Sequence, residues 1–214
     1  MMSIRHIAAA GALAAWPMLA FAESAVLETS FVWTPPSGQS GEIAGSYAAL
    51  LTTPEGAAMR LESSGYEPGH VVTVWFVAIQ APENCTARPC PPTDAMGRSD
   101  KVDSVAALGG SAVVDKDGRI AVGGFMPVGR VASNFFETEL TKPETAEFHL
   151  AVHDHGPLIP EAIADMLTSY RGGCTDASIP PYYPAVAASF GTPGPNDCKT
   201  VQVAIFMQDE ATMN

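Results

Sequence analysis

The sequence is poor in charged residues and especially poor in basic ones. Only 16% of its 214 residues are charged, and 11 Lys and Arg stand against 23 Asp and Glu, which gives a formal net charge of −12. Recognition of nucleic-acid phosphates and docking on anionic lipid both need a surplus of Lys and Arg. The composition therefore excludes nucleic acid as a partner and argues against docking on an anionic membrane surface. Apolar types make up 47% of the chain, so disorder is not expected either.

Long apolar runs are absent beyond the N-terminal segment. A short basic stretch precedes the apolar run from Ile7 to Leu19, and Ala20-Phe21-Ala22 then supplies the small-x-small pattern of a signal-peptide cleavage site. The run is shorter than the about 20 residues that a transmembrane helix needs. We therefore expect residues 1–22 to be a signal peptide. Residues 23–214 should form a single periplasmic or secreted domain with no membrane span.

Signatures of catalysis and of cofactor binding are also missing. The sequence has no Gly-x-Ser-x-Gly nucleophile motif, no phosphate-binding loop and no dinucleotide-binding fingerprint. No residue is therefore assigned as catalytic or as binding an organic cofactor. We expect a protein that is not an enzyme, and a metal-dependent enzyme is the last of three functional alternatives.

Cysteines are few, and their even number points to disulfides. All four, Cys85, Cys90, Cys174 and Cys198, lie in the expected mature chain. In an oxidising compartment the simplest outcome is two bridges. We expect Cys85–Cys90 and Cys174–Cys198, because each pair brackets a Pro- or Gly-rich stretch. A thiolate metal site or a redox pair is the alternative, although neither pair has Cys-x-x-Cys spacing.

Glycine and proline are abundant, and they divide the sequence into short apolar segments. The 19 Gly and 18 Pro are spread along the chain at the spacing of an all-β sandwich or barrel. Strands are predicted at Val26–Trp33 and Ala58–Glu62. The segment Val71–Ile79 is apolar at both parities, so we expect a central strand covered on both faces. The predicted fold is all-β: a single antiparallel β-sandwich with one short helix and two disulfides.

The other predicted elements include a hairpin and the single helix. Residues 115–118 (Asp-Lys-Asp-Gly) form the hairpin turn, where Gly118 can take the left-handed conformation. The helix spans Pro160–Tyr170, with proline in its first turn and Gly172-Gly173 beyond its end. The strands predicted in this part of the chain are Ser111–Val114, Arg119–Val122, Phe135–Leu140, Ala146–His155 and Val201–Met207.

Three of the five histidines crowd one predicted strand. Alternate residues of a strand share a face, so Glu147, His149, His153 and His155 point one way. The apolar residues between them point the other way and form the core face. We therefore expect the histidines to face solvent or a cleft.

Spacing limits which of these histidines can share an ion. Cα atoms two positions apart in a strand lie about 6.6 Å apart, and those four positions apart about 13 Å. His153 and His155 can therefore hold one copper or zinc ion, whereas His149 joins them only if the strand bends near Asp154. The alternative is a set of polar residues on a solvated sheet face. The candidates for a third ligand are His70, Glu147 and Asp154.

Two motifs around these histidines resemble known families. His153-Asp154-His155-Gly156, followed by Gly172-Gly173-Cys174, resembles the His-x-His and Gly-Cys run of copper–zinc superoxide dismutases. The same His-x-His-Gly is similar to the core of chordin-type secreted β modules. The dismutase pattern has further histidines downstream, and this sequence has none after His155, which argues against dismutase activity.

A broader resemblance covers residues 60–205. The stretches Val74-Trp75-Phe76, Pro82-Glu83-Asn84-Cys85 and Glu147-Phe148-His149-Leu150, with His155-Gly156-Pro157, are similar to a group of exported bacterial proteins of unassigned function. That resemblance implies a β fold and an exported location but no chemistry. The leading prediction is thus a non-catalytic exported protein that binds copper or zinc. The second is a structural or recognition module of the cell envelope that binds protein or glycan through its loops.

Overall fold

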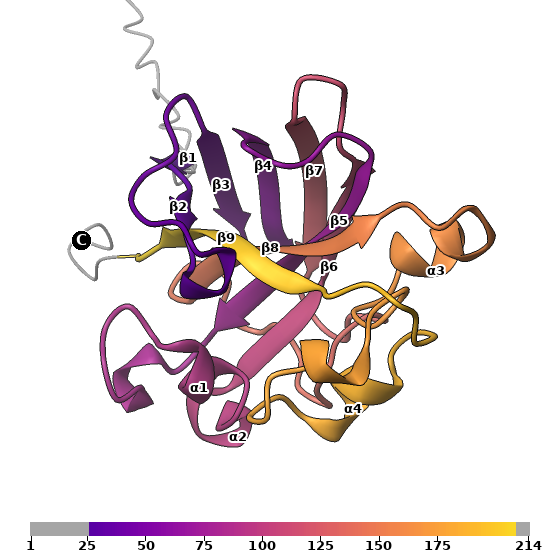
Figure 1. Cartoon of the computed structure of the whole chain (residues 1–214). Helices are drawn as coiled ribbons and strands as arrows, with labels where there is room; N and C mark the ends of the chain where they lie inside the picture. Colours follow the sequence, from indigo (N-terminus) through magenta and orange to yellow (C-terminus); the bar gives the residue numbers. More distant parts are fainter. Residues whose placement is uncertain (1–25, 209–214) are drawn as a thin grey trace, which may run out of the picture.

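The structure is a computed structural model that describes residues 26–208 (Figure 1). The expected signal peptide, residues 1–22, and the expected mature start at Glu23 lie outside the described residues. No helix among residues 26–208 is long and apolar enough to cross a membrane.

Two antiparallel sheets pack face to face, which confirms the predicted β-sandwich (Figure 1). The four-stranded sheet has the order β1-β3-β4-β7 and the five-stranded sheet the order β2-β9-β8-β5-β6. In the first sheet, the strands are β1 (Val26–Thr29), β3 (Tyr47–Thr53), β4 (Gly56–Ser64) and β7 (Arg119–Pro127). In the second, they are β2 (Val32–Trp33), β9 (Lys199–Phe206), β8 (Glu147–Pro157), β5 (His70–Ile79) and β6 (Ser104–Val113).

Strand β5 is buried on both faces, as its apolar sequence predicted. One parity of its side chains, including Val74 and Phe76, enters the core between the two sheets, where Phe76 packs 5.3 Å from Phe148 of β8. The other parity, including Trp75 and Val77, belongs to a second core on the outer face of the five-stranded sheet. Loops rather than a third sheet cover that outer face, so the molecule has two apolar cores that share strand β5.

The predicted hairpin at residues 111–122 is wrong in its pairing, although its turn is present. Gly118 has a φ of 71° and its N–H donates to Asp115 O, as a tight turn requires. However, β6 pairs with β5 and β7 pairs with β4, so the turn connects the two sheets. The strands cross closely at Gly109 and Gly124, where a Cβ on Gly124 would lie 2.0 Å from the Gly109 carbonyl oxygen. A crossing that close requires glycine.

Two other predicted strands differ from the structure. Val26–Trp33 is divided into β1 and β2 because the chain changes sheets at Phe31, which is fully buried in the central core. The prediction of a strand at Phe135–Leu140 is wrong, since that segment is a loop with a single bridge from Leu140 to Gly129. This loop caps the free edge of β6, because Asn134 Oδ1 accepts the backbone N–H of Ala106 at 2.9 Å.

The helices are all short and lie in the loops. The helix predicted at Pro160–Tyr170 consists of a 3-10 turn, Pro160–Ala162, and α3, Ile163–Met166. The α-helix therefore has only one turn and ends at Met166, well before Gly172 and Gly173, rather than continuing to Tyr170 as predicted. The other α-helices are α1 (Pro92–Ala95), α2 (Ser99–Val102) and α4 (Ala185–Ser189), and further 3-10 turns lie at Pro35–Ser37, Pro82–Asn84 and Asp176–Ser178.

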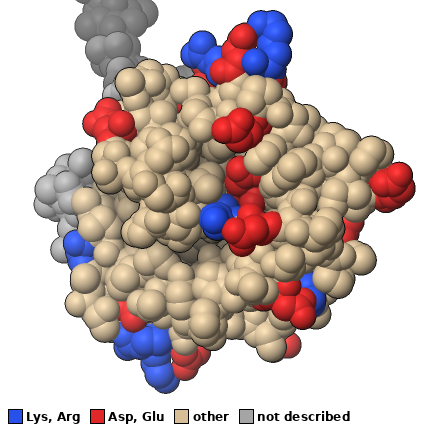
Figure 2. Space-filling model, viewed as in Figure 1, with Lys and Arg blue, Asp and Glu red and all other residues tan. Residues whose placement is uncertain are grey.

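Charged side chains are scattered on the face of the molecule seen in Figure 2. They lie in several separate groups, with uncharged side chains between them. Several basic residues in the described chain are already paired with acids, for example Arg98 with Asp94 at 2.9 Å and Lys199 with Asp197 at 2.9 Å. The acidic excess therefore does not form one continuous patch on this face.

Candidate functional site beneath the C-terminal loop

The histidines of β8 point away from the central core, as predicted, but they are not exposed to solvent. His149, His153 and His155 have exposed fractions of 6%, 1% and 0%. The expectation of a solvent-facing or cleft-facing surface is therefore wrong. The reason is that the loops of residues 82–103 and 158–198 fold back over the outer face of the five-stranded sheet, a topological fact that strand periodicity does not contain.

His155 is fixed by hydrogen bonds on both ring nitrogens. Nδ1 lies 2.8 Å from the carbonyl oxygen of Gly172, which can only accept, so Nδ1 carries the proton. Nε2 then accepts from the hydroxyl of Thr73 at 2.9 Å, and the Thr73 oxygen accepts the indole N–H of Trp75 at 3.0 Å. Burial lowers the pKa of His155, and the ring is neutral in this arrangement.

His153 packs as an aromatic ring. It stacks on Tyr170, with ring centroids 4.3 Å apart, and meets the ring of His155 edge-on at 4.8 Å. Burial, and to a lesser degree the nearby His155, hold the pKa of His153 well below its ordinary value of 6.5. Its Nδ1 lies 3.5 Å from the hydroxyl of Thr200 on β9. The register of β8 against β9 shifts between Val152 and His153, directly before this pair.

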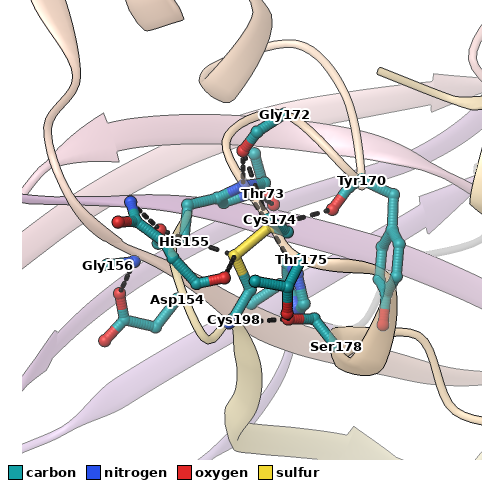
Figure 3. The surroundings of a disulfide bond; sticks show 12 residues. Thr73, Asp154, His155, Gly156, Tyr170, Gly172, Cys174, Thr175, Ser178 and Cys198 are labelled. Carbon is teal, nitrogen blue, oxygen red and sulfur yellow. Dashed lines mark hydrogen bonds between the residues drawn. A yellow bond between two sulfur atoms is a disulfide. The ribbon is translucent and has the colours of Figure 1, made fainter. Parts of the chain in front are cut away.

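Both predicted disulfides are present. Figure 3 shows that the Cys174–Cys198 bridge lies against His155. Sγ of Cys174 is 3.4 Å from Nδ1 of His155 and 3.9 Å from Nε2 of His153. One ring nitrogen of each histidine and the sulfurs of Cys174 and Cys198 all lie within 4.8 Å of one another, and all four residues are buried. We call these four residues the His–Cys cluster.

His149 lies at the other end of β8 and is not part of the His–Cys cluster. Its Nε2 is 2.7 Å from Oε1 of Glu147, which also accepts the backbone N–H of Cys90 at 2.6 Å. Oε2 of Glu147 faces Nε of Arg88 at 3.0 Å. Burial by itself raises the pKa of Glu147, but the hydrogen bonds from His149 and Cys90 and the charge of Arg88 outweigh it, so the pKa is lowered. His149 therefore anchors the first disulfide loop.

None of the residues expected as a third ligand reaches the pair His153 and His155. His70 is paired with Asp154, with Nδ1 3.0 Å from Oδ1, at the edge of the central core. Glu147 is held in the group just described. The structure instead places two sulfurs beside the histidines, an arrangement that sequence reasoning missed. The one indication in the sequence was that Cys198 closely precedes the last predicted strand, so that the Cys174–Cys198 bridge had to lie close to the sheet.

The chain was compared with known proteins to look for a precedent for this arrangement. No family model, no curated protein and no solved structure matches it. The resemblances to exported bacterial proteins, to chordin-type modules and to superoxide dismutases therefore stay predictions. The two disulfides fit a protein of an oxidising compartment.

Proposed function

We propose that this is an exported, non-catalytic metal-binding protein in which His153 and His155 hold a copper or zinc ion. The observation that carries the proposal is the His–Cys cluster, in which two imidazole nitrogens and two sulfurs from distant parts of the chain converge within 4.8 Å. Imidazole is a donor that zinc and copper prefer in proteins, and thiolate is another, which Cys174 and Cys198 can offer only when their bridge is open.

Burial supports a binding role over a catalytic one. The cluster lies beneath the 158–198 loop, and each of its residues is at most 2% exposed. A catalytic metal keeps an open coordination position that substrate can reach. A closed set of protein donors is instead typical of a structural or carrier site.

The hydrogen bonds of His155 define what metal binding must displace. Nδ1 faces the cluster but donates its proton to Gly172 O, so coordination through Nδ1 breaks that bond. Nε2 of His153 lies 3.9 Å from Cys174 Sγ, and the ring also makes a hydrogen bond with the backbone of Tyr170. Metal binding at either histidine therefore competes with an existing hydrogen bond to the backbone.

Calorimetric titration with Zn(II) and Cu(II) tests the proposal. It should be made on protein with its disulfides intact and on protein reduced under argon, with His153→Ala and His155→Ala beside the wild type. We expect binding of one ion in at least one of the two redox forms, and its loss in both variants. His149→Ala is the matched control, since His149 is a buried histidine on the same face of β8 that contacts Glu147 instead.

Absence of binding in both redox forms, or binding that neither substitution changes, would contradict the proposal. The recognition module would then be the better hypothesis. Its support is a shallow surface cleft of about 360 Å³ beside the same loop, lined in part by Pro180, Pro181 and Tyr183 with Arg171.

A further inference from the structure

We propose that the Cys174–Cys198 disulfide is the redox gate of this metal site. When a dithiol reductant opens the bridge, the two thiolates and the two histidines become a closed four-ligand site for Zn²⁺. The reverse exchange with a disulfide oxidant, which takes up the two electrons and becomes a dithiol, restores the bridge and expels the ion. This inference rests on the proposed metal-binding function and adds the ligand set, the preferred ion and the condition for binding.

The geometry of the His–Cys cluster is close to what zinc needs. Zinc–nitrogen bonds of about 2.0 Å and zinc–sulfur bonds of about 2.3 Å place tetrahedral ligand atoms about 3.3–3.8 Å apart. Nδ1 of His155 and Nε2 of His153 already lie 3.4 and 3.9 Å from Cys174 Sγ, and the whole set lies within 4.8 Å. Two imidazoles with two thiolates are a donor set of known structural zinc sites.

Charge explains why the disulfide form should reject a divalent ion. The cluster is buried, and with the bridge intact it offers only neutral donors to an ion of charge +2. An uncompensated charge in a buried site is strongly unfavourable. The two carboxylates whose charges act on His155 are engaged elsewhere, because Asp154 is paired with His70 and Asp165 accepts the N–H of Thr192.

Reduction supplies the missing charge. Two thiolates and two neutral imidazoles around Zn²⁺ give a site of net charge zero, whereas Cu⁺ in the same site leaves a net charge of −1. The neutral combination is the one that a buried site favours. We therefore expect Zn²⁺ to be preferred over Cu⁺ in the reduced protein.

The surroundings of His155 suit a coordinated imidazole. If Nδ1 binds zinc, the ring proton moves to Nε2, which then donates to the Thr73 oxygen 2.9 Å away. That oxygen already accepts the N–H of Trp75, and a hydroxyl oxygen can accept two hydrogen bonds. Metal-bound histidines commonly donate their second N–H to such a fixed acceptor. The cost is that Gly172 O loses its donor and the Thr73 hydroxyl, which donated to Nε2, loses its acceptor.

The reduction step balances with a dithiol as the only co-reactant. Two electrons and two protons pass from the dithiol to the bridge, so that the dithiol becomes a disulfide and Cys174 and Cys198 become thiols. Each thiol then releases its proton to solvent as its sulfur coordinates zinc. Both cysteines are buried, so the exchange requires transient opening of the loop that carries them.

The test compares zinc binding before and after reduction. Protein with intact bridges and protein reduced by a dithiol, then freed of it by desalting under argon, are titrated with zinc alone in competition with a chromogenic chelator. We expect one zinc per reduced chain and at least 100-fold weaker binding to the oxidised chain. Replacing zinc by Co(II) should give a sulfur-to-cobalt charge-transfer band in the reduced protein only, which reports thiolate ligation directly.

Two cysteine-pair variants separate this inference from simple loss of a bridge. Cys174→Ser with Cys198→Ser should abolish zinc binding and the cobalt band, whereas Cys85→Ser with Cys90→Ser removes the other bridge and should keep both after reduction. Circular dichroism checks that each variant is folded. Equal zinc affinity in the oxidised and reduced chains, or binding that survives the Cys174/Cys198 replacement, would overturn the gate while leaving metal binding in place. No binding in either redox form would overturn both proposals.

Discussion

The two ends of strand β8 bury polar groups under disulfide-bearing loops, but they do so by opposite means. At one end, Glu147 is charged and is held by Arg88, His149 and the backbone of Cys90, next to the Cys85–Cys90 bridge. At the other, His153 and His155 lie beside the Cys174–Cys198 bridge. Burial lowers the pKa of both histidines, which keeps the rings neutral.

The comparison of the two ends shows two ways in which polar side chains can be buried on a sheet face. A carboxylate that is buried needs partners of opposite charge, and Glu147 has them. An imidazole can shed its proton and then needs only one donor and one acceptor, which Thr73 and Gly172 provide for His155. The first end is therefore an electrostatic anchor, and the second is an aromatic one that leaves sulfur and nitrogen atoms in contact.

The largest expected effect comes from Trp75, which lies between the two ends and pairs with Ala151 of β8. Its ring is 3% exposed and stacks 4.4 Å from Phe135, so Trp75→Ala should cost about 3–5 kcal/mol of unfolding free energy. Urea denaturation measures the change. Phe125→Ala is the control, since Phe125 is 56% exposed on the other sheet and should cost about 0.5 kcal/mol or less. A cost below about 1 kcal/mol for Trp75→Ala would contradict the buried second core.

The two disulfides should differ in their contribution because they close loops of different length. The Cys174–Cys198 bridge spans 24 positions and the Cys85–Cys90 bridge spans 5. In the chain-entropy description, replacing both Cys174 and Cys198 by Ala lowers the free energy of unfolding by about 3–4 kcal/mol. Replacing both Cys85 and Cys90 by Ala lowers it by about 2 kcal/mol. Thermal midpoints of the two double variants compare them. The reverse order would show that the Glu147 end depends more on its bridge than loop length alone implies.

Thr73→Val should have a smaller effect that is confined to the His155 end. The substitution keeps the side-chain shape but leaves the Trp75 N–H and His155 Nε2 without their partner, at a cost of about 1–3 kcal/mol. Thr200→Val is the comparison beside the other ring, because the Thr200 hydroxyl lies 3.5 Å from His153 Nδ1 and bonds with Tyr170 and Tyr183 rather than with His155. Equilibrium denaturation measures both variants. If both variants lost the same unfolding free energy, the hydrogen bonds that link Trp75, Thr73 and His155 would contribute no more to stability than those of Thr200.

The smallest effects should appear as two separate pH dependences. His153 and His155 have lowered pKa values when folded, so the unfolded chain binds protons first. Stability should then fall as pH drops below about 6.5, by at most roughly 1.4 kcal/mol per histidine for each pH unit. Glu147 also has a lowered folded pKa, so its contribution is present above its ordinary value of 4.5 and is lost only below it.

Denaturation at pH 7.5, 5.5 and 3.5, which are about one unit to either side of these ordinary values, separates the two ends. His153→Phe preserves stacking on Tyr170 and should reduce the loss of stability between pH 7.5 and 5.5 to the part that His155 contributes. Glu147→Gln should leave that part unchanged and reduce the loss between pH 5.5 and 3.5. If His153→Phe retained the full wild-type slope near pH 6, His153 would not be a source of that slope.

Much of the sandwich could be read from the sequence because strand periodicity is local information. The parity of Phe148, Leu150 and Val152 identified the core face of β8, and the apolar run of β5 identified its central position. Loop composition was enough to pair the cysteines correctly. Strand β3 was not predicted, because its sequence, Tyr47–Thr53, has weak alternation between small and large side chains.

The site was harder to predict because it depends on contacts between distant segments. Spacing correctly placed His153 and His155 on one face, apart from His149. It gave no indication that residues 158–198 would cover that face, nor that β6 and β7 would belong to different sheets. The roles of Thr73, Tyr170 and Gly172 follow from that covering loop, since none of them has a recognisable motif of its own.

The strand order of the larger sheet also constrains when the protein can complete its folding. The last strand, β9, lies between β8 and the early strand β2, with Val203 aligned with both Ala151 and Val32. Neither β2 nor that side of β8 has its partner until residues 199–206, which form β9, are available to pair. Pairing of such distant segments is slow. During folding, the earlier strands therefore remain an incomplete sheet, and the segment that carries Cys198 is among the last to join it.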